Sequence, residues 1–321
     1  MTVDPLHEVR RAVLRAAAAH QPGERVLIGV SGGADSVTLA AVAAGCARET
    51  GVDFGAAVID HQLQPGSNAV AAAAAQQCRA LGLAEVFVAR VDVDGGPGAG
   101  GLENAARNAR RARLRELAAR WGAPAVWLAH TRDDQAETVL LGLLRGSGAR
   151  SLAGMRERDD IWERPLLGID RSTVRAALEQ LGLAAHADPH NDDPRFARVR
   201  VRQAVLPVMQ HELGGHIVGN LARTADLLRD DADALDAIAA AWLVDHPDLQ
   251  LVELAHLHRA VRTRVLRAAV LRRGTPANGL TKEHIDALDH LVMDPRTTGP
   301  VALPGPLAAH KDRAAGVIVL R

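Results

Sequence analysis

One short stretch of the sequence combines glycines, hydroxyls and a carboxylate in an order that predicts anion chemistry. In VLIGVSGGADSVTLA (27–41), an apolar run precedes a Ser/Gly loop and a helical pattern. Glycines at a helix start expose backbone N–H groups to phosphate, and the hydroxyls of Ser31 and Ser36 add two donors. Asp35 stands where an ordinary phosphate loop offers a lysine, and the GxxxxGK(S/T) pattern is absent from the sequence.

The carboxylate of this loop indicates a metal ion. Because a carboxylate repels phosphate unless a divalent cation bridges the two, Asp35 predicts Mg²⁺ at the loop. The alternative is that Asp35 only favours the first turn of its helix, where negative charge interacts well with the helix dipole. The loop by itself leaves both interpretations open.

A second acidic group occurs in LAHTRDDQAETVLLGLLRGSG (128–148). Asp134 and Glu137 are three residues apart in a helical pattern, so their carboxylates project to one side. Two adjacent acids suit an ammonium group or Mg²⁺. Thr131 and Asp134 also form a T-x-x-D capping arrangement, which accounts for Asp134 but leaves Glu137 unexplained.

Arginines concentrate on one predicted helix, GLENAARNARRARL (101–114). Arg107 and Arg110 share a face of this helix and can meet a phosphate or a carboxylate. For the neighbouring Arg111 and Arg115, a solvated helix face is the favoured interpretation.

A second arginine cluster lies in DPHNDDPRFARVRVRQAVLP (188–207), at the end of the first predicted domain. Its members are Arg195, Arg198, Arg200 and Arg202. Such a cluster suits an RNA backbone. One of these arginines is expected to pair with Asp192 or Asp193.

The elements that must position these residues alternate between strands and helices. Strands are predicted at 25–30, 56–60, 85–92 and 125–129. Helices are predicted at 36–49, 66–82, 102–121 and 133–145. This alternation predicts a doubly wound α/β fold, a parallel sheet with helices on both faces.

Beyond Pro207 the pattern becomes mainly helical. Helices are predicted at 216–243, 253–272 and 281–293, followed by a short β pair at 299–303 and 316–320. We therefore expect an N-terminal α/β domain with its linker at 1–207 and a smaller, mainly helical domain at 208–321.

Composition narrows the class of protein. The chain has 321 residues, 48% hydrophobic and 24% charged, with a net charge of zero, which fits a folded protein of two domains. Cys46 and Cys78 lack a CxxC spacing, which argues against a zinc site or a disulfide framework. With no apolar run of about eighteen residues and no signal-like amino end, a cytoplasmic protein without a membrane partner is expected.

The loop SGGADS (31–36) resembles the SGGxDS signature of the PP-loop, or N-type ATP pyrophosphatase, superfamily. The resemblance implies a fold that grips the β,γ-pyrophosphate of ATP together with Mg²⁺. It also implies that an acceptor oxygen attacks the α-phosphorus, which releases pyrophosphate and leaves an adenylate.

Five further stretches resemble motifs of one family in this superfamily, the tRNA(Ile)-lysidine synthetases. AVIDHQLQPGSNA (57–69) resembles its VDHxLR segment, 101–114 its GxExxARxxRY helix, and 128–148 its AHHxxDQxET…RGSG motif. WERPLLGI (162–169) resembles its RPLL segment, and 188–207 its DxxN…RNxxR…LP linker. The resemblance is to the short form of the family, which lacks a third domain.

The sequence departs from these motifs at four positions. Gln64 replaces a basic residue, Arg111 an aromatic, Thr131 a histidine and Val199 an asparagine. The motifs cover the first 207 residues, whereas the last third of the chain resembles the family only in helical character and in its LTKEHIDAL…GPVALPGP end.

The resemblance implies a reaction at the wobble cytidine of isoleucine tRNA. The C2 carbonyl oxygen of the base would attack the α-phosphorus of ATP, and the ε-amine of free lysine would then displace AMP. ATP is thus a substrate, Mg²⁺ a cofactor, and isoleucine tRNA and free lysine are the partners. A homodimer is left open.

The resemblance also implies residue roles. The ATP-binding set is Ser31, Gly32, Gly33, Ala34, Asp35, Ser36, Asp60, His61 and His130, with Asp35 as the Mg²⁺ ligand. The catalytic set is Asp35, Asp134, Glu137, Arg107 and Arg110, and the tRNA-binding set is Arg195, Arg198, Arg200 and Arg202. Within the catalytic set, the acids of 128–148 would contact the lysine ammonium or the metal, and the arginines a carboxylate or phosphate. For Asp60, a strand-end cap is the structural alternative.

Two other functions are kept as alternatives. One is a tRNA thiolase or another sulfurating or amidating ATP pyrophosphatase, although Cys46 and Cys78 are badly placed for sulfur chemistry. The other is a nucleotide sensor without catalysis. If the resemblance to the lysidine synthetases holds, Asp35→Ala and Glu137→Ala are each expected to abolish adenylate formation or transfer while leaving the fold intact.

Overall fold

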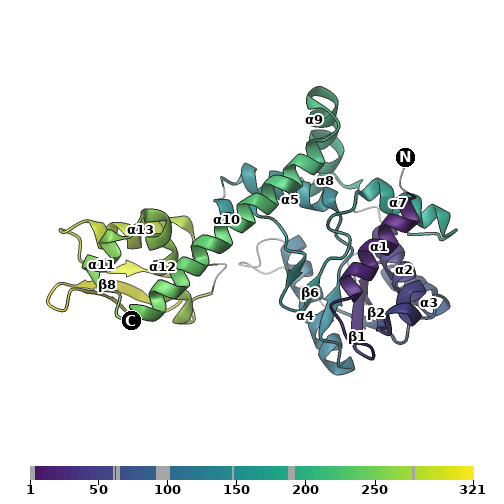
Figure 1. Cartoon of the computed structure of the whole chain (residues 1–321), viewed down its shortest axis with the longest axis horizontal. Helices are drawn as coiled ribbons and strands as arrows, with labels where there is room; N and C mark the ends of the chain where they lie inside the picture. The colour runs from purple at the N-terminus through teal and green to yellow at the C-terminus, as the bar shows by residue number, and fades with distance from the viewer. Residues whose placement is uncertain are drawn as a thin grey trace. The chain divides into compact units, whose positions relative to one another are not determined.

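The computed structural model describes residues 4–60, 62, 66–91, 102–146, 148–186, 192–276 and 279–321. The chain divides into two units, Met1–Asp226 and Leu227–Arg321 (Figure 1). Helix α10 (Ile217–Asp245) runs across this division. The domain boundary expected at residue 207 stays a prediction.

The first unit contains a six-stranded sheet. Its strands are β1 (Arg25–Val30), β2 (Asp53–Asp60), β3 (Val86–Arg90), β4 (Ala125–Trp127), β5 (Arg158–Asp159) and β6 (Trp162–Glu163). They lie in the order β3-β2-β1-β4-β6-β5, and every pairing is parallel except that of β5 with β6. The four predicted strands are present; β5 and β6 were not predicted, because two residues give no periodic signal.

The helices of this unit cover both faces of the sheet. They are α1 (Pro5–Ala17), α2 (Ala34–Thr50), α3 (Ser67–Ala80), α4 (Leu102–Trp121), α5 (Arg132–Leu144), α6 (Ala149–Leu152), α7 (Arg171–Gln180), α8 (Ala197–Arg200) and α9 (Leu206–Leu213), with a π-helical turn at Val201–Val205. Alternate residues of β1 enter different cores. Val26 and Ile28 join the core that α1, α2, α3 and α7 cover, whereas Leu27 joins the core beneath α4. The predicted doubly wound α/β fold is confirmed.

The strand order reverses between β1 and β4. From β1 the chain builds the sheet outward through β2 and β3, and then returns to place β4 on the other side of β1. In open α/β sheets, ligands bind at the carboxyl ends of the strands where the order reverses in this way. The Ser31–Ser36 loop and His130 follow β1 and β4 at that edge.

The second unit pairs helices with a small antiparallel sheet. After α10 come α11 (Leu251–His256), α12 (Arg259–Arg272), α13 (Lys282–Met293), β7 (Val301–Ala302), β8 (Ala308–Asp312) and β9 (Val317–Leu320). Their core includes Leu254, Leu266, Leu288 and Leu291. Within the described ranges, no helix of either unit is long and apolar enough to cross a membrane.

Two predictions for this unit were wrong. The predicted helix 253–272 is broken, because Leu257 and His258 adopt extended backbone angles and the His258 ring accepts the Ala260 N–H at 3.2 Å as the cap of α12. The strands near 299–303 and 316–320 do not pair with each other, since β8 lies between them. Ala309 is the buried residue of β8, so that strand lacks an apolar alternation.

A buried ion pair below the sheet gives a pH-dependent prediction. His20 Nε2 lies 3.0 Å from Glu163 Oε2, to which Trp127 Nε1 also donates at 2.8 Å. The hydrogen bond with Glu163 raises the pKa of His20 above 6.5, although burial opposes this shift. The contribution of protonated His20 to stability is therefore fully present below pH 6.5 and is lost as pH rises through the raised pKa.

We expect His20→Gln to lower the free energy of unfolding by about 1.5–3 kcal/mol near pH 5.5 and by clearly less near pH 9. Urea denaturation of both proteins at the two pH values measures this difference. An equal loss at both values would contradict a charged His20–Glu163 pair.

Candidate active site

The loop after β1 is held in shape by its own hydroxyls. Ser31 N donates to Ser36 Oγ at 3.2 Å, and Ser36 Oγ donates to the Gly33 carbonyl at 2.9 Å. Gly32 has φ +83°, a left-handed conformation that favours glycine. The predicted strand, loop and helix are therefore present, with Ala34 as the first residue of α2.

The amino end of α2 is open to an anion. Gly33 precedes the helix, and among the described residues no side chain caps it. The first N–H groups of a helix lack partners within the helix and carry partial positive charge. The loop therefore presents the phosphate-binding geometry that the sequence predicted.

Asp35 lies in the first turn of α2 with one carboxylate oxygen unsatisfied. Its Oδ1 is buried and has no hydrogen-bond partner within the described part of the chain. Its Oδ2 is 3.7 Å from Arg171 Nε. Burial, together with the charge of Asp134, raises the pKa of Asp35 to about 6 against the opposing charge of Arg171. Because capping the first turn would require neither burial nor an orphaned oxygen, the carboxylate fits a cation ligand.

Asp134 and Glu137 project from the first turns of α5. The capping arrangement of Thr131 with Asp134 is present, since Asp134 Oδ2 accepts from Thr131 N at 2.8 Å and from its hydroxyl at 2.9 Å. Asp134 Oδ1 instead accepts hydrogen bonds from Arg171 and Arg202. Glu137 is fully buried. The capping interpretation therefore holds for Oδ2, whereas a contact of Asp134 with an ammonium group or Mg²⁺ stays a prediction.

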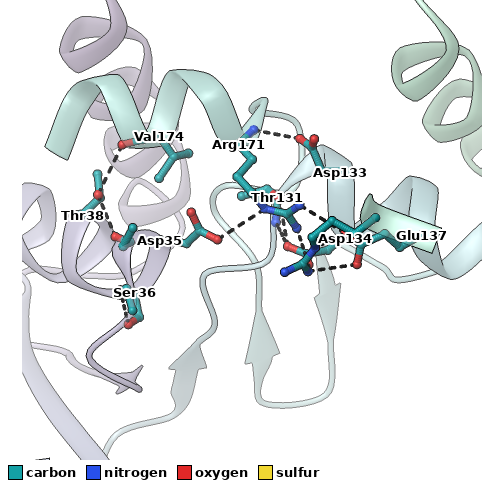
Figure 2. Close-up of polar contacts among 12 residues, drawn as sticks. Asp35, Ser36, Thr38, Thr131, Asp133, Asp134, Glu137, Arg171 and Val174 are labelled. Atoms are coloured by element: carbon teal, nitrogen blue, oxygen red, sulfur yellow. Dashed lines mark hydrogen bonds and ion pairs between the residues drawn. The ribbon is translucent and has the colours of Figure 1, made fainter. Parts of the chain in front are cut away.

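Arg171 joins these acids to Asp35, as Figure 2 shows. Its Nη2 donates to Asp134 Oδ1 at 2.8 Å and its Nη1 to Glu137 Oε1 at 3.1 Å. Its backbone N–H donates to Asp133 at 2.8 Å. Burial disfavours ionisation of Asp134, but Arg171, His130, the Thr131 N–H and Arg198 together outweigh it and lower the pKa of that carboxyl.

Sequence reasoning missed Arg171. One local signal was available, because Arg171 is the first residue of α7, where the helix dipole disfavours positive charge. A buried arginine at that position needs acidic partners, but the sequence does not say which ones.

Two arginines of the predicted RNA-binding cluster point inward instead. Arg202 Nε donates to Glu137 Oε1 at 2.7 Å, and Arg198 Nε lies 3.4 Å from Glu137 Oε2. Arg198 also donates to the Thr138 hydroxyl at 3.0 Å. Three guanidiniums thus surround the buried carboxylate of Glu137. A contact of Arg198 or Arg202 with tRNA stays a prediction.

A second positive region lies beside His130. Arg110 of α4 is half-buried, and its buried Nε has no partner among the residues that the structure describes. Burial and the charges of Arg107 and Arg111 lower the pKa of Arg110. Burial, with nearby arginines that include Arg110, lowers the pKa of His130 to about 3, so its ring is neutral. This surplus of buried positive charge fits an anionic ligand.

Comparison with known proteins identifies the family. A model of the PP-loop domain matches residues 5–209, and a model of the TilS substrate binding domain matches residues 249–314. A tRNA(Ile)-lysidine synthase of Rhodococcus erythropolis is 49% identical, covering 92% of this chain and 89% of that protein. One of Thermobifida fusca is 49% identical, covering 94% and 93%. The chain belongs to the tRNA(Ile)-lysidine synthase family. The resemblance predicted from the motifs is confirmed.

A solved structure supports the fold assignment. The U34-tRNA thiolase NcsA from Methanococcus maripaludis, with its 4Fe-4S cluster, matches with a TM-score of 0.59 and 18% identity over 70% of this chain and 80% of that chain. At this identity the likeness concerns the PP-loop fold alone.

Two further residues that match tRNA(Ile)-lysidine synthase motifs, Asp60 and Gln135, form hydrogen bonds with backbone groups. Asp60 ends β2 and accepts the Gln62 N–H at 3.0 Å, which is the strand-end cap considered as an alternative. His61 falls outside the described residues. Gln135 is buried and bonds the backbone of Met155 through both its amide oxygen and its nitrogen, so it fastens α5 to that segment.

The remaining two arginines of the predicted RNA-binding cluster are exposed. Arg195 pairs with Asp193 at 2.6 Å, which confirms the expected local ion pair. Arg200 donates to the carbonyls of Pro194 and Arg195. A role for either in tRNA binding stays a prediction for this tRNA(Ile)-lysidine synthase family member.

Proposed function

We propose that this protein joins free lysine to C2 of the wobble cytidine of isoleucine tRNA. The C2 carbonyl oxygen attacks the α-phosphorus of ATP, which forms the oxygen–phosphorus bond of an adenylated base and releases pyrophosphate. The ε-amine of lysine then adds at C2 and AMP leaves with that oxygen. The proposal rests on the tRNA(Ile)-lysidine synthases that are 49% identical over most of the chain.

The single observation in the structure that carries the proposal is the unsatisfied carboxylate of Asp35 at the open end of α2. Mg²⁺ is commonly held by one or two carboxylates together with substrate phosphates, and no cluster of three or more acidic, His or Cys ligands occurs among the described residues. Asp35 thus fits a shared ligand. When bound, the ion would neutralise charge on the leaving pyrophosphate.

Residues of this chain would do the remaining work. The N–H groups at the start of α2 and the Ser31 and Ser36 hydroxyls bind the phosphates. Asp134 and Glu137 hold the lysine ammonium, and one of them accepts a proton from it before the amine attacks. Arg107 and Arg110 bind the lysine carboxylate or a phosphate.

The tRNA would be held by both units. The second unit matches the TilS substrate binding domain, and the exposed Arg195 and Arg200 offer contacts to the RNA backbone from the first. The target base has to leave its stack to reach the loops at the carboxyl ends of β1 and β4. Association into a homodimer stays a prediction.

The thiolase alternative is disfavoured by the cysteines. Cys46 and Cys78 are both buried free thiols, and burial raises the pKa of Cys78 to about 11. Because the thiolate is the nucleophile and metal ligand, neither residue is suited to carry sulfur or an iron–sulfur cluster.

Product analysis tests the proposal. Purified full-length protein is incubated with ATP labelled at the α-phosphate, Mg²⁺, isoleucine tRNA and lysine. We expect AMP and pyrophosphate, with release of AMP dependent on both tRNA and lysine. Formation of ADP and orthophosphate would overturn the scheme. Turnover that needs a sulfur donor would identify a thiolase, and ATP binding without turnover a sensor.

A further inference from the structure

Arginines balance the negative charge of the acid cluster, which consists of Asp35, Asp134 and Glu137. The carboxylates of Asp35, Asp134 and Glu137 meet three guanidiniums, those of Arg171, Arg198 and Arg202. His130 adds no charge at neutral pH, because its ring is neutral. An extra cation that enters this buried site without an anion would therefore be uncompensated.

The acceptor atoms that an ammonium group would use are already bonded. One oxygen of Asp134 is held by Thr131, and the other accepts Arg171 Nη2 at 2.8 Å. Glu137 Oε1 accepts Arg171 Nη1 at 3.1 Å. The side chain of Arg171 is 10% exposed, so its guanidinium fills the position between the two acids (Figure 2).

We propose that Arg171 is a positioning residue that withholds Asp134 and Glu137 from lysine until ATP and Mg²⁺ are bound. This inference rests on the proposed function and concerns the order in which the substrates of that site bind. The Nε of Arg171 is already 3.7 Å from Asp35 Oδ2, at the phosphate-binding end of α2. Phosphate groups arriving there attract the guanidinium away from the acids, and their negative charge balances the incoming ammonium.

The consequence is cooperative binding. Lysine binds weakly to the free protein, because its ammonium has to displace a guanidinium that forms a hydrogen bond with each of the two acids. Once nucleotide has drawn Arg171 aside, the position of its guanidinium between these acids is open to the ammonium. By linkage, lysine raises the affinity for nucleotide by the same factor as nucleotide raises the affinity for lysine.

Calorimetric titration of the full chain tests this coupling. Lysine is titrated alone and in the presence of Mg²⁺ and α,β-methylene ATP, which cannot be cleaved between its first two phosphorus atoms. We expect the nucleotide analogue to raise the affinity for lysine by about tenfold or more, and lysine to raise the affinity for the analogue equally.

Substitutions assign the coupling to Arg171. In Arg171→Gln the acids lose one of their three guanidiniums and the site has surplus negative charge, so lysine should bind without nucleotide and the coupling factor should fall toward one. Arg171→Lys keeps the positive charge, so this variant guards against a loss of folding. Because a single ammonium group cannot bridge the two acids, we expect a reduced coupling factor. The control is Arg48→Gln, because Arg48 is exposed and lies in the last turn of α2, at the end of that helix opposite to the phosphate loop.

Two results would overturn the inference. One is a wild-type affinity for lysine that does not depend on the nucleotide analogue, and the other is an unchanged coupling factor in Arg171→Gln and Arg171→Lys. A purely structural role would weaken both ligands without changing this factor. A failure of the proposed function would be seen differently, as the absence of AMP release that depends on tRNA and lysine. If lysine binds neither with nor without the nucleotide analogue, both proposals are overturned.

Discussion

Glu137→Ala is expected to lower the free energy of unfolding of the first unit by about 3–5 kcal/mol. Glu137 is fully buried and its carboxylate meets the guanidiniums of Arg171, Arg198 and Arg202. Removing it leaves buried positive charge without its partner, which costs more than the loss of one hydrogen bond. The sequence alone suggested that this substitution spares the fold, and the burial of Glu137 changes that expectation.

Urea denaturation followed by tryptophan fluorescence measures the effect, since Trp121, Trp127 and Trp162 all lie in the first unit. Glu137→Gln keeps the volume and one acceptor, so a smaller loss is expected. Glu116→Ala is the matched control, because Glu116 is 60% exposed and pairs with Arg113 on the helix surface. Its effect should stay within about 0.5 kcal/mol. A loss as small as the control's for Glu137→Ala would contradict the structure of the acid cluster.

Asp35→Asn is expected to have opposite effects on catalysis and stability. Turnover should fall by at least about 10²–10³-fold, because the charged ligand for the ion at the phosphates is lost. At neutral pH the protein without ligands should become more stable, because burial raises the pKa of Asp35 to about 6 and so disfavours its ionised form. Asparagine fills the same space without a charge.

The pH dependence of this gain follows from the direction of the shift. With a folded pKa of about 6 and an ordinary value of 3.8, the contribution of protonated Asp35 is fully present below 3.8 and is lost as pH rises through about 6. The variant should therefore match the wild type near pH 4 and exceed it by up to about 3 kcal/mol above pH 7.

Denaturation across this range, without nucleotide or Mg²⁺, measures the gain. Asp53→Asn, at an exposed position at the start of β2, is the control and should change neither turnover nor the pH profile. Wild-type turnover in Asp35→Asn would remove Asp35 from the site. A stability difference that does not vary with pH would show that Asp35 is not desolvated.

The phosphate loop could be predicted from sequence because its parts are contiguous. The apolar run of β1, the glycines and Asp35 lie within the eleven residues from Arg25 to Asp35, and their local geometry follows from residue type alone. The acids of α5 were visible for the same reason, since a helix fixes the direction of residues three positions apart. Strand and helix alternation likewise fixed the fold class.

Tertiary structure decided what those acids contact. Arg171 is 34 residues from Glu137 and Arg202 is 65 residues from it, and no local pattern links such positions. The sequence predicted that Arg198 and Arg202 belong to an RNA-binding cluster, because the local sequence does not show whether an arginine on a short helix faces solvent or a buried acid. Packing of α8 and of the π-helical turn against α5 sets that direction. The sequence therefore determined which groups are present, and the fold determined their partners, because ion pairing in a buried site depends on distance in space.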